Sequence, residues 1–250
     1  MIENEFKMLE DSDFSIFHPH ANSRDMLICF SGRRAGFVDP FHFSFYQEAR
    51  GIPANTLFLR DNTGRWYFRG FPGLSGSLRE TARVLGDFAK SRDIQQITVV
   101  GVSAGTSAAM IVGTLMGAQR VFCLGCISTI HPDQRRNPEV GHLGPKMRAG
   151  LELIWNHPEA ETDLFDVRGV LQLAGTAAPA VRIHHDPDHQ KDSWHAQRLA
   201  DLPTVTLVPR PGFEHDIKRF SKDLATNPDF LSGFATERGA TSAPRKFRQG

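Results

Sequence analysis

The sequence predicts an α/β protein with a mostly parallel central sheet, helices on both faces, and a short insertion over the carboxyl edge of the sheet. Two observations carry this prediction. Short β-branched apolar runs alternate with helix-like segments, and one run leads directly into a serine flanked by glycines at the start of a helical segment. Such alternation is typical of a parallel sheet covered by helices on both faces. With 250 residues, 40% hydrophobic, the chain is large enough for one such domain.

Six apolar runs are predicted to be strands of the parallel sheet, because each is short and several are rich in β-branched residues. They cover residues 25–30, 56–59, 97–100, 120–124, 181–184 and 205–208. Segments 6–9 and 14–17 are expected to add an antiparallel pair at one edge. Helices are predicted between these runs at residues 43–50, 77–90, 103–116 and 192–202.

Residues 1–235 are expected to form a single domain. Within it, the regular alternation lapses over residues 128–173, which we interpret as an insertion with one amphipathic helix at 146–155. Residues 236–250 are expected to be a flexible basic tail, because they hold one aromatic residue and cannot bury enough apolar surface.

Composition narrows the classes of function. The formal net charge is +1, so no global charge predicts binding to nucleic acid or a membrane surface. An acidic start and the lack of a long apolar run predict a cytoplasmic protein without a membrane span. The three cysteines, Cys29, Cys123 and Cys126, lie in or beside apolar runs and are expected to be reduced core residues. The sequence leaves the oligomeric state open.

The most informative motif is the G-x-S-x-G that runs from Gly101 to Gly105, with Ser103 at its centre. A nucleophilic serine sits on a sharp turn from strand to helix, and such a turn leaves no room for side chains two residues before and after it. The apolar run before this motif and the small apolar residues after it supply the strand and the helix. We therefore predict that Ser103 is a nucleophile.

A serine needs a base to take its proton, and a carboxylate usually orients that base. His215 follows the last predicted strand in a Pro-Gly-Phe-Glu-His phrase, and the loop after the preceding strand carries Asp186 and Asp188. The three residue types thus occur in the order serine, aspartate, histidine.

These phrases resemble the α/β-hydrolase superfamily over residues 24–220. In that family the acid follows a strand in a phrase like I-H-G-x-x-D, and the histidine follows the next strand in P-G-x-x-H. The resemblance implies a serine esterase or acyl hydrolase with Asp188 as the acid and His215 as the base. Because His185 replaces the usual glycine, Asp186 is the alternative acid, and Asp192 is a further one.

Backbone N–H groups must also meet the negative charge of a tetrahedral intermediate. One donor is expected to be the N–H of Ala104, next to the nucleophile at a helix N-terminus. The resemblance implies that the second is the N–H of Arg33, since Gly32 matches the glycine of the family's H-G-x phrase, although Ser31 replaces its histidine.

Loop residues at the same edge of the sheet are candidates for substrate binding, because ligands of open α/β sheets bind there. They are Gly32, Arg34, Arg60, Trp66 and Tyr67. Their arginines and aromatic rings could hold a polar or anionic substrate such as a saccharide ester. They could equally be solvated loop charges with an aromatic residue packed beneath the loop.

Histidines and aspartates also cluster between residues 184 and 195, and such ligands suit zinc. The cluster loosely resembles the H-x-H-x-D-H phrase of metallo-β-lactamases, but Asp186 stands where that phrase needs a histidine. We therefore expect no metal and no cofactor, and interpret His184, His185, His189 and His195 as solvated or supporting residues.

The sequence therefore predicts a serine hydrolase that cleaves a small-molecule or saccharide acyl ester through Ser103, His215 and Asp188. An acyltransferase or a thioesterase could use the same residues. A binding protein without enzymatic activity is the alternative from a different class.

Overall fold

The computed structural model describes residues 2–32, 43–136 and 144–234. Its centre is a seven-stranded sheet in the order β1-β3-β2-β4-β5-β6-β7, in which only β1 runs antiparallel to its neighbour. The predicted α/β class is confirmed. The strands are β1 (Ser15–His18), β2 (Asp25–Phe30), β3 (Asn55–Leu59), β4 (Gln96–Val102), β5 (Arg120–Leu124), β6 (Ala180–His185) and β7 (Val205–Pro209).

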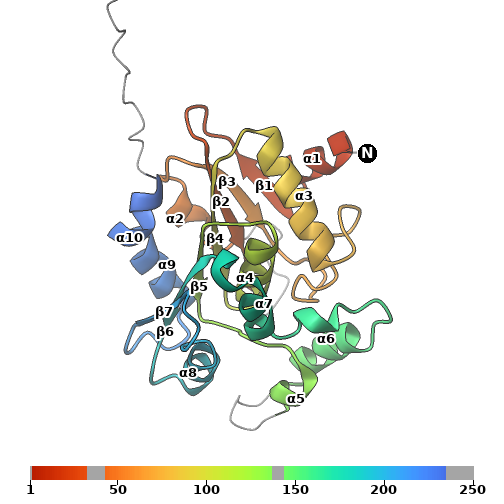
Figure 1. Cartoon of the computed structure of the whole chain (residues 1–250), viewed down its shortest axis with the longest axis vertical. Helices are drawn as coiled ribbons and strands as arrows, with labels where there is room; N and C mark the ends of the chain where they lie inside the picture. The colour runs from red at the N-terminus through yellow and green to blue at the C-terminus, as the bar shows by residue number, and fades with distance from the viewer. Residues whose placement is uncertain (1, 33–42, 137–143, 235–250) are drawn as a thin grey trace, which may run out of the picture.

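Helices cover both faces of this sheet (Figure 1). The core on one face includes α1 (Ile2–Glu10), α3 (Leu78–Ser91), α4 (Gly105–Leu115), α6 (Pro145–Trp155), α7 (Val167–Ala174) and α8 (Gln190–Gln197). The core on the other face includes α2 (Tyr46–Ala49), α9 (Ile217–Ala225) and α10 (Pro228–Leu231). Alternate residues of β4 supply both cores: Val99 faces the first, whereas Val100 and Val102 face the second. The two-period pattern of a strand produces this division.

The register of the parallel strands sets the position of the loops that follow them. Phe30 of β2 pairs with Gly101 of β4, and Leu124 of β5 pairs with both Val102 and His184. The loops after these strands consequently leave the sheet at one carboxyl edge, where open α/β folds bind ligands.

The predicted helices and strands differ from the structure in three places. Residues 6–9 were expected to form a strand but lie in α1, because Phe6 and Leu9, three positions apart, share one helical face toward the core. The helix expected at 43–50 is reduced to α2, since Phe45 adopts φ 66°. The helix expected at 192–202 is α8, which begins at Gln190 after an N-cap at His189 and ends at Gln197, five residues earlier than expected. The strand expected at 14–17 is confirmed as β1.

The segment from residue 128 to 173 contains α6, most of α7 and a short helix, α5 (Pro132–Arg135). The three cysteines are free and buried, as predicted. Burial raises the pKa of the Cys29 and Cys123 thiols, which keeps them protonated. No helix in the described part of the chain has the length and apolarity needed to cross a bilayer. The predicted basic tail lies outside the described residues.

Candidate active site

Ser103 occupies the turn between β4 and α4 in a left-handed backbone conformation, with φ 47°. A Cβ added at Gly101 would lie 2.6 Å from Cα of Thr106, and one at Gly105 would lie 2.4 Å from the Phe30 carbonyl oxygen. Both distances are far below van der Waals contact, so only glycine fits at either position. The sharp turn presents the Ser103 side chain at the carboxyl edge of the sheet.

His215 lies in the loop between β7 and α9 and reaches Ser103 from the side of β5. Its Nε2 atom is 3.0 Å from Ser103 Oγ. Gly125, which follows β5, makes room for the ring, because a Cβ there would lie 2.7 Å from His215 Cε1. Gly125 also has φ +67°, so the position favours glycine on two grounds. No motif in the sequence marks this glycine, although its position directly after a predicted strand is a signal that could have found it.

The carboxylate that contacts His215 belongs to Asp192, in the first turn of α8. Its Oδ2 and Oδ1 atoms lie 2.8 Å and 3.0 Å from His215 Nδ1, and the residue is fully buried. The expectation that Asp188 fills this place is therefore corrected to Asp192. Asp188 is exposed and lies two residues before α8 begins, and its backbone N–H donates a hydrogen bond to the Asp186 carboxylate.

Asp186, the alternative acid, has a different place in the structure. Its Oδ1 accepts a hydrogen bond from the Asp188 N–H at 2.9 Å, and its Oδ2 accepts one from the Glu214 N–H at 2.6 Å. These N–H donors, with that of Gly212, lower the pKa of the Asp186 carboxyl. Asp186 thus joins the loop after β6 to the residue that precedes His215, and it positions the histidine loop.

The loop after β2 approaches Ser103 from the opposite side. A Cβ at Gly32 would lie 3.3 Å from Ser103 Cβ, so the backbone of this loop lies against the serine. The Gly32 N–H donates to Ser44 Oγ at 3.2 Å, and the Ser44 N–H donates to Ser31 Oγ at 2.9 Å. Arg33 and Arg34, the predicted second oxyanion donor and a predicted substrate contact, lie outside the described residues. Ala104 lies directly before α4, at the N-terminus where sequence reasoning expected it.

The three other candidate substrate residues occupy the loop after β3. Tyr67 is buried, and its hydroxyl donates to the Ser31 carbonyl at 2.8 Å. Trp66 is also buried, whereas Arg60 lies over the Phe43 ring with its guanidinium 5.3 Å from the centroid. Tyr67 and Trp66 therefore pack beneath the loop, which is the second of the two interpretations that the sequence left open.

The histidines of the 184–195 segment separate in the structure. His184 is fully buried in the sheet, and this burial lowers its pKa to about 4. His195 is buried between Ser128 and Arg135, and its Nε2 lies 2.7 Å from an Arg135 nitrogen. Desolvation, with the Arg135 charge, holds the pKa of His195 well below its ordinary value. These histidines are supporting residues of the core.

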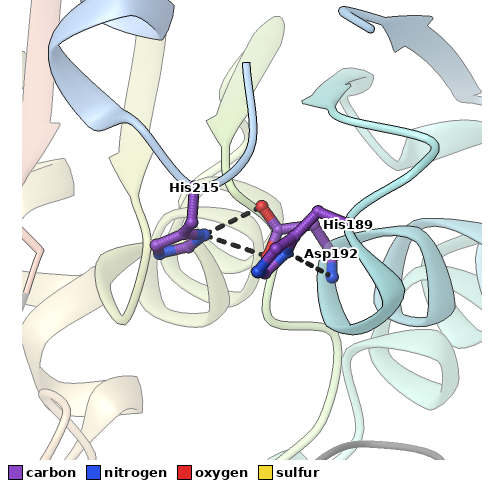
Figure 2. A group of neighbouring side chains, drawn as sticks. All are labelled: His189, Asp192 and His215. Atoms are coloured by element: carbon purple, nitrogen blue, oxygen red, sulfur yellow. Dashed lines mark hydrogen bonds and ion pairs between the residues drawn. The ribbon is translucent and has the colours of Figure 1, made fainter. Parts of the chain in front are cut away.

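His189, by contrast, lies beside Asp192 and His215 (Figure 2). Its Nδ1 is 3.2 Å from Asp192 Oδ1, and its ring stacks on that of His215 with centroids 5.6 Å apart. The potential ligand atoms of His189, Asp192 and His215 all lie within 4.8 Å of one another, which is close enough to hold a metal ion. In the described residues, no other group of three histidine, cysteine, aspartate or glutamate side chains meets this condition.

No protein-family model matches the sequence, and no curated protein matches it. Solved structures do resemble the fold. The capsule O-acetyltransferase of Neisseria meningitidis serogroup A aligns with TM-score 0.59 and 8% identity over 87% of this chain and 93% of that chain. An esterase from Pyrobaculum calidifontis aligns with TM-score 0.54 and 14% identity, over 83% of this chain and 76% of that chain.

An S-formylglutathione hydrolase from Agrobacterium tumefaciens aligns with TM-score 0.54 and 11% identity, over 84% of both chains. At such low identity these likenesses show the fold alone. The chain has the α/β-hydrolase fold that the motifs predicted, and its chemistry must be argued from the site.

Proposed function

We propose that the protein is a serine enzyme that forms an acyl-enzyme from an ester-type substrate and releases the acyl group to water. One observation carries the proposal: Ser103 Oγ lies 3.0 Å from His215 Nε2, while His215 Nδ1 lies 2.8 Å from the buried Asp192. A serine bonded to a histidine that is oriented by a carboxylate is the arrangement that activates a hydroxyl nucleophile.

In this proposal Ser103 attacks the acyl carbonyl while His215 takes the hydroxyl proton. His215 then gives that proton to the leaving alcohol, and a water molecule repeats the sequence to release the acid. Asp192 holds the imidazole so that Nε2 faces the serine, and it stabilises the imidazolium. The Ala104 N–H, at the N-terminus of α4, stabilises the oxyanion together with a second donor that we assign to Arg33.

Transfer of the acyl group to an alcohol is the second candidate function. It uses the same residues, with a hydroxyl of an acceptor in place of water. The likeness to a capsule O-acetyltransferase, which spans most of both chains, favours this candidate over other variants. A thioester donor fits the same chemistry, since only the leaving atom changes.

Incubation with a fluorophosphonate, followed by intact-mass spectrometry, tests the nucleophile. We expect one adduct on the wild-type protein and none on Ser103→Ala or His215→Ala, with unchanged far-UV circular dichroism in both variants. No adduct on the folded wild-type protein would contradict the proposal and favour a binding protein. A panel of acyl donors, with and without added alcohols or sugars, then separates hydrolysis from transfer by the ratio of products.

A further inference from the structure

The group formed by His189, Asp192 and His215 makes conflicting demands on one atom. His189 Nδ1 accepts a hydrogen bond from the Asp192 N–H at 3.3 Å as the N-cap of α8, so it carries a lone pair. The same atom lies 3.2 Å from the Asp192 Oδ1 atom. A lone pair and a carboxylate oxygen repel each other at this distance. A metal cation removes such repulsion, because both atoms become its ligands.

Two of the three spacings between donor atoms suit a small tetrahedral ion, and all three donor atoms lie within 4.8 Å of one another. Zinc binds imidazole nitrogen and carboxylate oxygen at about 2.0–2.2 Å, which places neighbouring ligand atoms roughly 3.3 Å apart. Here Asp192 Oδ1 is 3.2 Å from His189 Nδ1, and Asp192 Oδ2 is 2.8 Å from His215 Nδ1. The two histidines come from different loops, and Figure 2 shows both rings beside the carboxylate.

The exposure of the two histidine side chains would also allow a metal ion to reach the group. The side chains of His189 and His215 are 33% and 35% exposed, whereas Asp192 is buried. An ion can therefore approach from solvent, and His189 can turn toward it by giving up its N-cap hydrogen bond to the Asp192 N–H. The buried carboxylate supplies the negative charge that a divalent cation requires.

We propose that His189, Asp192 and His215 form an inhibitory site for a zinc ion. The inhibitory effect rests on the proposed function, whereas zinc binding does not. Zinc at His215 Nδ1 takes the lone pair of that atom, so the ring proton moves to Nε2 and no proton leaves the imidazole. Nε2–H then donates to Ser103 Oγ and cannot accept the hydroxyl proton. Asp192, engaged with the metal, no longer orients the ring.

The test compares the full chain with two variants, which make the same histidine-to-asparagine substitution at the N-caps of two different helices. His189→Asn removes the metal ligand and keeps a good N-cap acceptor for α8. His131→Asn makes the same change at α5, where His131 caps the helix by accepting from the Asp133 N–H. Each protein is stripped with a chelator. Zinc binding is then measured by calorimetry, and the rate of fluorophosphonate labelling is measured with and without zinc.

We expect one zinc ion per chain for wild type and His131→Asn, and labelling that zinc slows and EDTA restores. In His189→Asn, the zinc concentration needed for half inhibition should rise by at least about tenfold. Magnesium, which prefers oxygen ligands, should have no effect. Zinc inhibition with the same midpoint in His189→Asn would overturn the proposal, as would zinc binding that leaves labelling unchanged.

If wild type takes no label even without zinc, the proposed function fails, but calorimetry still decides the metal site. A weakened isotherm in His189→Asn alone would support the site. Equal isotherms in all three proteins would refute it.

Discussion

Three aspartates follow β6 within seven residues, and small differences in their positions determine which of them contacts His215. Asp186, Asp188 and Asp192 are all carboxylates after β6, yet only the last contacts His215 Nδ1. Asp188 is exposed and Asp186 is occupied by backbone N–H groups of two loops. The three residues therefore have separate tasks that mutagenesis can distinguish.

Replacing Asp192 with asparagine should slow labelling of Ser103 strongly. The amide keeps the size of the side chain but favours the wrong tautomer of His215, and loss of a triad carboxylate in this way lowers turnover by about 10⁴. The matched change Asp188→Asn should leave the rate within about twofold, because an exposed carboxylate without a catalytic contact contributes little. Fluorophosphonate labelling rates of both variants check this. A larger loss for Asp188→Asn than for Asp192→Asn would restore the original assignment from sequence.

At the scale of single helices and strands, two helical glycines differ in the space around them, so replacing each with alanine should change stability in opposite directions. A Cβ at Gly105, at the start of α4, would lie 2.4 Å from the Phe30 carbonyl oxygen, whereas a Cβ at Gly86 in α3 meets nothing within 4 Å. Helix α4 approaches β2 closely at the first glycine, and α3 is open to solvent at the second.

We expect Gly105→Ala to destabilise the fold by about 2 kcal/mol or more, because a backbone atom cannot move aside as a side chain can. Gly86→Ala should instead stabilise it by about 0.5–1 kcal/mol, since alanine lowers the entropy of the unfolded chain. Urea unfolding, compared at equal m-values, measures both effects. Equal stability of the two variants would contradict the close approach of α4 to β2.

The elements that sequence predicted well are those fixed by local sterics and hydrophobic pattern. The turn at Ser103 is one, because the two glycines that flank it occupy positions where a side chain would clash with neighbouring atoms. The start of α8 is the counterexample: the helix was expected from residue 192 but begins at Gln190, because His189 caps it and histidine is an unusual N-cap residue. In the structure that shift places Asp192 inside the first turn, where its side chain turns inward to His215.

For the molecule as a whole, the parallel sheet and its carboxyl edge followed from the alternation of elements, but the order of the strands and the full site did not. The contact of Asp192 with His215 depends on how two loops meet across β6 and β7, and no local pattern encodes that distance. Gly125 was missed for the same reason, since its partner is a ring 90 residues away in the chain. The sequence pattern thus predicts the sheet and its helices, whereas the packing of two loops determines that Asp192 contacts His215.

Burial of histidines makes the stability of the whole fold dependent on pH. His184 is fully buried, neither ring nitrogen has a hydrogen-bond partner, and its pKa is lowered to about 4 from 6.5. As pH falls below 6.5 the unfolded chain binds a proton that the folded chain still refuses, so stability is present above this pH and declines toward pH 4. Between pH 7 and pH 5 this residue should remove about 2 kcal/mol.

His184→Leu should abolish that part of the decline, because leucine binds no proton and the imidazole has no hydrogen bond to lose. Urea unfolding of both proteins at pH 7 and pH 5 measures it, as the difference between their pH-dependent losses. His185 and His195 also have lowered pKa values, so a smaller decline should persist in the variant. Asp201, whose pKa is lowered to about 2, loses its stabilising charge only at more acidic pH, outside this window. An identical pH dependence in the two proteins would mean that the His184 imidazole is not kept neutral by burial.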